Sequence, residues 1–287
     1  MRVPFLFLTP ACVVIGIGTA YGQTGKLNWF NVIIVLIGAL ATHISTNVFN
    51  EYFDFKSGLD AKTQRSPFSG GSGTLQAEPE MEKPVLIMAW ATVLFITAIG
   101  IYFVILHGWQ LLPLGLFGVF LAITYTIWWT KNPLACLLAP GLGFGVVMVM
   151  GTHFALTGTY TWEAFIASLL PTFLVSNLLL LNQFPDVEAD QSIGRKHYPI
   201  AIGRNSSSIL YGIFLLLAYL SVIVGVLIKL LPIFSLLALL TSILGWKIFQ
   251  NARQNAENIE ALAPSMGMNV IVNLATPILL AIGLFIG

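Results

Sequence analysis

The feature that most constrains this chain is a series of long apolar segments separated by polar connections. Nine such segments can be read, and most reach the ~20 residues that a helix needs to cross a bilayer. They lie at roughly 3–22, 29–53, 84–106, 110–129, 133–157, 162–184, 206–228, 231–249 and 266–286. They lack the alternation of barrel strands, and a backbone in lipid must satisfy its own hydrogen bonds. We therefore predict an all-α integral membrane protein with nine transmembrane helices, in a single domain over residues 1–287.

The basic residues predict how these segments are oriented. With nine spans, the N-terminus and the connections after spans 2, 4, 6 and 8 share one side of the membrane. That side carries eleven of the thirteen basic residues: Arg2, Lys56, Lys62, Arg65, Lys83, Lys131, Arg195, Lys196, Arg204, Lys247 and Arg253. Because Lys and Arg collect in cytoplasmic loops, we expect this side to face the cytoplasm, with the chain in the cell (plasma) membrane. The chain has no basic patch interleaved with aromatic residues, which argues against a nucleic-acid partner.

Two acidic clusters close the second and sixth apolar segments. The first runs from Asn50 to Asp54 and is followed by Asp60; the second reads NQFPDVEAD at 182–190. Charge beside hydrocarbon is costly, so such residues indicate a functional site. Within each cluster Asn and Asp recur four residues apart, on one face of a helix.

Carboxylates stacked in this way repel each other unless a cation lies between them. Mg²⁺ prefers oxygen ligands and commonly bridges carboxylates to a diphosphate. Two such clusters on neighbouring helices would hold two ions with a diphosphate between them, at one face of the membrane. The alternative is that both clusters are solvated helix ends; Glu188, half a turn from Asp186 and Asp190, fits a position facing solvent or behind the metal ligands.

Further polar residues lie between the clusters and inside the spans. The Gly/Ser-rich stretch 62–73 offers backbone N–H groups to an anion, and Lys62 or Arg65 could neutralise phosphate oxygens, although such a stretch is also typical of a linker. His43 and Asn47 line one face of the second segment above Asp54, and Tyr125 lies inside the fourth. Polar residues in spans usually face the bundle interior, where hydrogen bonds between helices explain most of them.

At its two acidic clusters the chain resembles the UbiA superfamily of intramembrane prenyltransferases. That family carries an Asn-Asp-x-x-Asp type motif after its second helix and an Asp-x-x-x-Asp type motif after its sixth, where this chain has NEYFDFKSGLD (50–60) and NQFPDVEAD (182–190). Glu51 stands where the family often has Asp. The resemblance spans essentially the whole chain and implies nine helices around a central cavity.

Other stretches resemble the branch that prenylates 1,4-dihydroxy-2-naphthoate in menaquinone biosynthesis. They are RSPFSGGSGTL (65–75), GLGFGVVMVMGTHF (141–154) and NQFPDVEAD. The chain departs from the family at GRKHYPIAIG (194–203), where relatives run Gly-Lys-x-x-Leu before a second basic residue. We expect Arg195 or Lys196 to supply the basic contact there.

The resemblance implies a Mg²⁺-dependent aromatic polyprenyltransferase that moves a polyprenyl group from its diphosphate to an aromatic acid. The implied metal ligands, for two ions, are Asp54, Asp60, Asp186 and Asp190. The residues implied in catalysis are Asp54, Asp186, Arg65, Lys131 and Tyr125, with Tyr125 facing the allylic cation. The residues expected to bind substrate are Asn50, Asn182, Arg65, Lys62, Arg195, Asn47 and His43.

Two other functions stay open on the sequence. The acidic motifs are shared by branches that prenylate 4-hydroxybenzoate in the ubiquinone pathway or another aromatic ring. A different class is an ion-coupled membrane transporter, because intramembrane Asp, Asn and His also serve ion pathways. A transporter usually places its site near the bilayer midplane, whereas these acids gather at one face.

Overall fold

Every regular element that the structure describes is helical. The computed structural model describes residues 3–63 and 71–287, and no strand occurs in that part of the chain. The long elements are α1 (Leu8–Thr24), α2 (Trp29–Ser57), α4 (Glu82–His107), α5 (Leu112–Thr124), α6 (Pro133–Leu142), η5 (Gly143–Met150), α7 (Gly151–Thr157), α8 (Trp162–Asn182), α10 (Tyr198–Leu227), η6 (Ile233–Thr241), α11 (Ser242–Gln254) and α12 (Ile259–Ile286). The short ones are η1 (Val3–Phe7), α3 (Thr74–Ala77), η2 (Pro79–Met81), η3 (Trp109–Leu111), η4 (Trp129–Lys131) and α9 (Val187–Ser192).

The predicted spans are all helices of one elongated bundle. Over the described residues, eight helical segments are long and apolar enough to cross a membrane. The remaining predicted span, 110–129, corresponds to Trp109–Thr124, an apolar helix that is shorter than the other eight. The prediction placed the start of the seventh span at 206, but α10 begins at Tyr198 and is kinked at Gly203, whose φ is 81°.

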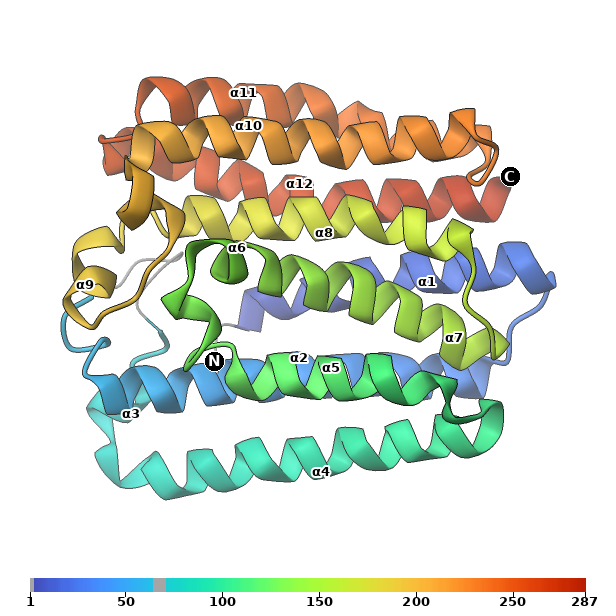
Figure 1. The fold of residues 1–287 in the computed structure, drawn as a ribbon, viewed down its shortest axis with the longest axis horizontal. Coiled ribbons are helices and arrows are strands. Elements are labelled where there is room, and N and C mark those ends of the chain that lie inside the picture. The colour runs from blue at the N-terminus through green and yellow to red at the C-terminus, as the bar shows by residue number, and fades with distance from the viewer. Residues whose placement is uncertain (1–2, 64–70) are drawn as a thin grey trace.

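The two connections that carry the acidic clusters meet at one end of the bundle. In Figure 1, α3 and α9 lie together at the left end, and the C-terminus lies at the right. Lys62 Nζ, in the first connection, donates to Ser192 Oγ of α9 at 3.3 Å. The connections after the second and sixth predicted spans therefore lie at the same end of the bundle.

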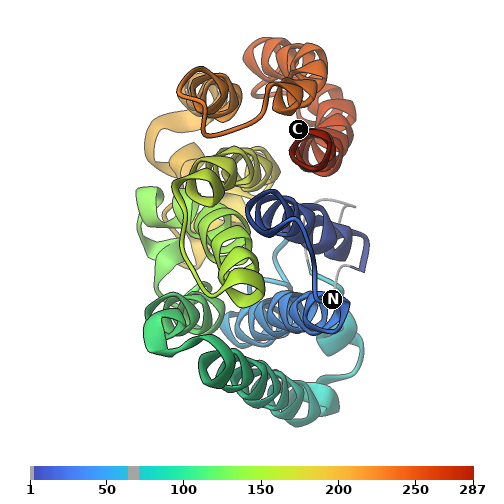
Figure 2. The same ribbon diagram turned by 90° about the vertical axis from the view of Figure 1, so that its right-hand side faces the viewer.

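Helix α8 lies at the centre and α4 at the edge (Figures 1 and 2). The most apolar window of α8 is 72% buried inside the protein, whereas that of α4 is 22% buried. Helix α8 packs against α1, α6, η5, α10 and α12. Exposed apolar residues such as Leu94 and Ile105 on α4 form an outer surface suited to lipid.

Local signals fix where the motif-bearing helices begin and end. Asn28 caps α2 by accepting hydrogen bonds from Phe30 N and Asn31 N, and Gly58 ends it with a φ of 71° that glycine adopts at little cost. Thr161 caps α8 by accepting from Ala164 N at 3.2 Å. Both helices therefore finish at the same end of the bundle, at Ser57 and Asn182.

The helix over 133–157 contains a π-helical stretch, η5, where it crosses α8. An added Cβ at Gly141 or Gly145 would overlap Thr172 of α8. At Gly115 in α5, by contrast, an added Cβ meets no described atom within 4 Å. The close approach of α6 and η5 to α8 therefore requires the absence of a side chain at Gly141 and Gly145.

We expect Gly145→Ala to lower the thermal midpoint of the purified protein, because overpacking typically costs about 1–3 kcal/mol. The control is Gly115→Ala, where Ala should be neutral or stabilising, since it is the better helix former by roughly 1 kcal/mol. The measurement is thermal unfolding of both variants in the same detergent. Equal midpoints for the two variants would show that η5 and α8 do not depend on this contact.

Candidate functional site

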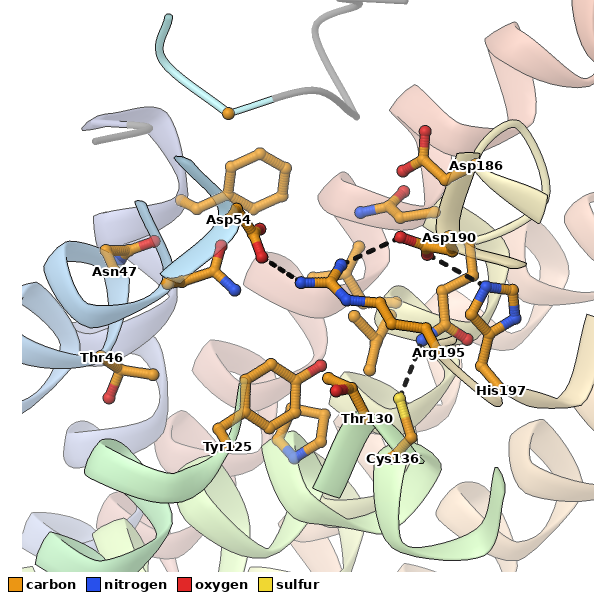
Figure 3. A pocket seen from close by; sticks show the side chains of 18 of the residues that line it. Thr46, Asn47, Asp54, Tyr125, Thr130, Cys136, Asp186, Asp190, Arg195 and His197 are labelled. Carbon is orange, nitrogen blue, oxygen red and sulfur yellow. Dashed lines mark hydrogen bonds and ion pairs between the residues drawn. The ribbon is translucent and has the colours of Figure 1, made fainter. Parts of the chain in front are cut away.

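A cavity of about 250 Å³ lies at the end of the bundle where α2 and α8 finish. Its walls come from α2, α6, α8 and the connections around them (Figure 3). The polar and charged residues that line it are His43, Thr46, Asn47, Asn50, Glu51, Asp54, Asp60, Thr63, Tyr125, Thr130, Cys136, Asn182, Gln183, Asp186, Asp190, Arg195 and His197. Apolar residues such as Phe5, Leu8 and Leu178 line it as well.

The cavity gathers most of the residues that the sequence singled out. Ten of them line it: His43, Asn47, Asn50, Asp54, Asp60, Tyr125, Asn182, Asp186, Asp190 and Arg195. Lys62 and Lys131 are not among the lining residues, and both are exposed. Arg65 lies outside the described residues. The choice left open between Arg195 and Lys196 falls on Arg195, because Lys196 is exposed and contributes a backbone N–H to Thr130 O at 2.7 Å.

Arg195 bridges the two acidic clusters. Its Nη1 donates to Asp190 Oδ1 at 3.0 Å, and its Nη2 donates to Asp54 Oδ1. The other oxygen of Asp190 lies 3.0 Å from His197 Nε2. Figure 3 shows the guanidinium group between the two carboxylates, with His197 bonded to Asp190 at the right of the view. One cation thus joins a carboxylate from α2 to a carboxylate from α9.

The surroundings of Arg195 keep it cationic. Burial by itself would lower the pKa of the guanidinium group, but the neighbouring Asp54 and Asp190 carboxylates outweigh it and raise that pKa above its ordinary value. The side chains of Asp54 and Asp190 are 10% and 6% exposed. The net stability that a buried ion pair contributes depends on the geometry of its hydrogen bonds. Removal of one partner would leave a buried charge without compensation.

Hydrogen bonds between uncharged side chains join the helices that line the cavity. Gln183 Nε2 donates to Cys136 Sγ at 3.2 Å, which joins the end of α8 to α6. Asn50 Nδ2 donates to Thr126 Oγ1 at 3.1 Å, which joins α2 to the connection after α5. These bonds hold the helix ends that carry the charged groups.

The glycine-rich stretch is tied to α2 through Glu51. Glu51 is buried, and its carboxylate accepts from the backbone N–H of Ser72 at 3.3 Å and from the Ser72 hydroxyl. Gly71 lines the cavity in a conformation with φ 61°. Residues 71 and 72 are thereby held beside the cavity.

Arg204 holds the second acidic cluster from outside. Its Nε donates to the carbonyl oxygen of Phe184 at 2.8 Å, and its Nη2 donates to both oxygens of Glu188 at 2.8 and 3.0 Å. The Glu188 side chain is largely exposed. Its slight burial would raise its pKa, but the hydrogen bonds from Arg204 outweigh this and lower the pKa below its ordinary value. Glu188 therefore belongs to the support of the loop and does not line the cavity.

The oxygen atoms that line the cavity are of the type that binds Mg²⁺. Carboxylates and amide oxygens dominate the lining, and the buried Oδ1 of Asn182 has no hydrogen-bond partner in the part of the chain that the structure describes. Hard divalent cations take such oxygen ligands. Within residues 3–63 and 71–287, however, no three His, Cys, Asp or Glu side chains are gathered closely enough to share an ion. Arg195 occupies the space between Asp54 and Asp190, so these two carboxylates are held by a cation from the protein itself.

Several lining residues escaped the sequence reasoning, among them His197, Gln183 and Cys136. His197 is 1% exposed, and it lies in the segment 194–203 where the chain departs from the family pattern, which was the available signal. Gln183 stands beside Asn182 within the second cluster. Cys136 is buried, and its sulfur accepts a hydrogen bond at the cavity wall.

Comparisons with known proteins identify relatives of the whole chain. The sequence model of the UbiA prenyltransferase family matches residues 10–286. A 1,4-dihydroxy-2-naphthoate octaprenyltransferase from Bacillus subtilis (strain 168) is 28% identical over 223 residues, 75% of this chain and 69% of the relative.

Two solved structures share the fold. The apo structure of a UbiA homologue from Aeropyrum pernix K1 superposes with a TM-score of 0.76 at 18% identity and covers 100% of this chain and 98% of its own. A UbiA homologue from Archaeoglobus fulgidus, bound to DMAPP and Mg²⁺, has a TM-score of 0.62 at 14% identity and covers 97% of this chain and 99% of its own.

We expect Arg195→Gln to lower the thermal midpoint in the absence of divalent cation, because a buried pair broken on one side costs about 3–5 kcal/mol. Added Mg²⁺ should restore more of the midpoint in this variant than in the unmodified protein, since a cation can then replace the guanidinium group between Asp54 and Asp190. The measurement is a Mg²⁺ titration followed by thermal unfolding.

Lys196→Gln is the matched control, because Lys196 is the neighbouring cation and its side chain is exposed. It should leave both the midpoint and its response to Mg²⁺ unchanged. If Arg195→Gln and Lys196→Gln responded alike, Arg195 would not be the cation that joins the clusters.

Proposed function

The chain belongs to the UbiA prenyltransferase family, and from that premise we propose that it transfers a polyprenyl group from its diphosphate to 1,4-dihydroxy-2-naphthoate in menaquinone biosynthesis. The observation that carries the proposal is the convergence of both acidic clusters on one cavity, with Arg195 between them. The naphthoate acceptor is supported by the name of the Bacillus subtilis relative.

The donor's diphosphate belongs at the charged end of the cavity. Asp54, Asp60, Asp186 and Asp190 are the residues that would hold Mg²⁺, and the Mg²⁺ named with the Archaeoglobus fulgidus homologue supports this choice of metal. When bound, Mg²⁺ would neutralise charge on the diphosphate and so ease its departure. Asn50 and Asn182 add amide groups on the same side of the cavity.

Arg195 then has a second role in the same place. Its charge is already buried and oriented, so a diphosphate entering the cavity meets a guanidinium group that forms paired hydrogen bonds to phosphate oxygens. A cation positioned in advance stabilises negative charge that develops on the leaving group. Lys62 and Lys131, exposed near the mouth, would act through attraction of the anionic donor.

The chemistry follows from loss of the diphosphate. The allylic C–O bond of the donor breaks, the electron pair leaves with the diphosphate, and carbon 1 becomes cationic. Tyr125 presents its ring and hydroxyl to the same cavity, where an aromatic face stabilises a cation. The ring carbon that carries the carboxylate attacks carbon 1, and its bond to the carboxylate then breaks, so that CO₂ leaves and the electron pair of that bond restores the aromatic ring.

The acceptor fits deeper along α2. Asn47 and His43 lie one and two turns beyond Asn50 on this helix and line the cavity, so they can receive the acceptor's hydroxyl and carboxylate groups. His43 Nδ1 lies 2.8 Å from Thr9 Oγ1, which fixes the ring. Polar groups placed in a largely apolar wall orient a ligand in this manner.

The membrane setting matches this reaction. The helices make the chain a multi-pass membrane protein, and the bias of basic residues supports a cavity that faces the cytoplasm, in the plasma membrane. Membership of a prenyltransferase family favours this activity over the ion-coupled transporter. Prenylation of 4-hydroxybenzoate remains the alternative within the family.

The direct test is transfer of label from geranylgeranyl diphosphate to 1,4-dihydroxy-2-naphthoate by protein in liposomes with Mg²⁺. We expect a prenylated, decarboxylated product whose formation stops with EDTA and returns with added Mg²⁺. A parallel reaction with 4-hydroxybenzoate should give little product. Label in that second reaction alone would overturn the acceptor, and no transfer to either ring would overturn the proposed activity.

Asp186→Asn should reduce turnover by a factor of about 10² or more, because the charge that holds the metal is lost while the side chain keeps its size. Glu188→Gln, in the same loop but outside the cavity, should keep turnover within a factor of roughly five, since an exposed ion pair contributes little. The measurement is initial rate at saturating Mg²⁺ for both. Similar losses in the two variants would mean that the loop, and not the Asp186 carboxylate, controls the rate.

A further inference from the structure

A second cavity, of about 820 Å³, lies between the end of α1, the start of α8, the connection from α10 to η6 and the end of α12. This end of the bundle faces the viewer in Figure 2, where the C-terminus is marked. We call it the distal cavity, and we propose that it binds the headgroup of a phospholipid that carries both a phosphate and a primary ammonium group. Lys229 would bind the phosphate and Glu163 the ammonium group.

Helix α8 places the two cavities at opposite ends of the bundle. Its last residue, Asn182, lines the cavity of the acidic clusters, whereas its capping residue Thr161 and Glu163 line the distal cavity. The helix has 21 residues. At 1.5 Å per residue it spans about 30 Å, which is the thickness of the hydrocarbon core of a bilayer. The distal cavity therefore lies at the other membrane surface, apart from the proposed prenyl transfer.

The distal cavity carries two opposite charges. Lys229 and Glu163 are the charged residues among the described residues that line it, and both are exposed. Within residues 3–63 and 71–287, neither side chain forms a hydrogen bond or an ion pair. A ligand with a negative and a positive group would complement both charges, whereas a simple anion would be repelled by Glu163 and a simple cation by Lys229.

The threonine hydroxyl groups of this cavity are engaged within the protein. Thr19 Oγ1 donates to Gly16 O at 3.0 Å and lies 2.9 Å from His153 Nδ1. The other ring nitrogen of His153 lies 3.4 Å from Thr161 Oγ1. Thr161 Oγ1 also accepts from the backbone N–H of Ala164 at 3.2 Å. These bonds join α1, α7 and α8, so recognition of a polar headgroup falls to the charged pair.

The backbone at Lys229 indicates a role for its side chain. Lys229 has a φ of 61° and is the non-glycine residue with positive φ in the part of the chain that the structure describes. It follows Ile228, the C-cap of α10, at a position where glycine is common because an L side chain is disfavoured there. Glycine would make this turn at lower cost, and such an outlier suggests a function for the side chain.

The surroundings of the charged pair indicate a lipid as the source of the headgroup. Leu227 and Ile228 directly precede the lysine, Ile233 lines the cavity, and all three are exposed. Trp162, beside the glutamate, is also exposed, and tryptophan is enriched at membrane surfaces. Acyl chains would cover the exposed apolar side chains, which a soluble ligand of the same charge would leave in place.

The carboxylate selects the kind of ammonium group. A primary ammonium group donates N–H hydrogen bonds, and such bonds to a carboxylate are strong because both partners are charged. The quaternary ammonium group of a choline headgroup has no N–H to donate, and a glycerol headgroup has no positive charge. Glu163 therefore favours an ethanolamine headgroup over both.

The test is lipid binding to the purified protein in detergent, followed by native mass spectrometry. Phosphatidylethanolamine, phosphatidylcholine and phosphatidylglycerol with the same acyl chains are titrated separately. We expect the ethanolamine lipid to bind about tenfold more tightly than the other two, because each of these lacks one charged hydrogen bond. Equal binding of the three lipids would overturn the proposal, since lipids that merely surround a membrane protein bind without regard to the headgroup.

Soluble glycerophosphoethanolamine, which has the same headgroup without acyl chains, tests the source of the ligand. It should bind more weakly than the lipid, because it buries no hydrocarbon. If it bound as tightly as the lipid, the occupant would be a soluble zwitterion and the lipid would be the wrong choice.

Lys229→Gly removes the cation but keeps the turn. Its thermal midpoint without lipid should be unchanged or higher, since glycine adopts a positive φ readily. Its affinity for the ethanolamine lipid should fall about tenfold, because a charged hydrogen bond is lost. The matched control is Lys26→Gly, since Lys26 is an exposed lysine in the connection after α1 that does not line the distal cavity. Equal affinity in the two variants would show that Lys229 does not bind the phosphate.

Glu163→Gln tests the other half of the headgroup. This variant should lose the preference for phosphatidylethanolamine over phosphatidylglycerol, because the carboxylate that accepts from the ammonium group is gone. A preference that persisted in Glu163→Gln would overturn the assignment of the ammonium group. These readouts use neither the prenyl donor nor the acceptor, so their outcome is independent of the proposed function.

Discussion

The structure depends on how it neutralises negative charge at the end of an apolar bundle. Asp54 and Asp190 approach each other from α2 and α9, and both carboxylates are buried. Without a cation they would repel each other and would be poorly solvated. Arg195 supplies that cation, and by bonding both carboxylates it also joins two parts of the chain that lie more than a hundred residues apart. The charge at the centre of the candidate site therefore also holds it together.

The same interaction stabilises the clustered carboxylates when no ligand is bound. A set of carboxylates arranged for metal ions is unstable when no cation is bound. Here Arg195 stands in part of that space, and under the proposed function a metal–diphosphate would replace it as the cation beside Asp54. Arg195 would then be free to bond phosphate oxygens. Because its charge is already buried and oriented, little reorganisation is needed when the leaving group develops charge.

Much of the fold could be predicted because bilayer thickness and the apolar runs set the helices. The distribution of basic residues also predicted that the two acidic clusters lie at the same end. Ten of the predicted site residues line one cavity there. The contacts inside that cavity could not be predicted in the same way. Whether Arg195 or Lys196 turns inward depends on the path of the loop after α9, where the backbone N–H of Arg195 donates to Asp190 O and that of Lys196 donates to Thr130 O. Lys131 follows a span directly, yet its side chain is exposed, because closeness along the chain does not set the direction of a side chain.

The geometry of the donor accounts for where the acids lie in the sequence. A polyprenyl diphosphate in a bilayer keeps its head at the surface and its tail along the lipid chains. An enzyme that takes it without turning it needs charge at the ends of helices and apolar surface along their length. Helix α2 has both on one face: Ala39 and Thr42 line an apolar cavity, and Asn50 lies beside Asp54. Under the proposed function the acidic clusters must therefore close apolar segments.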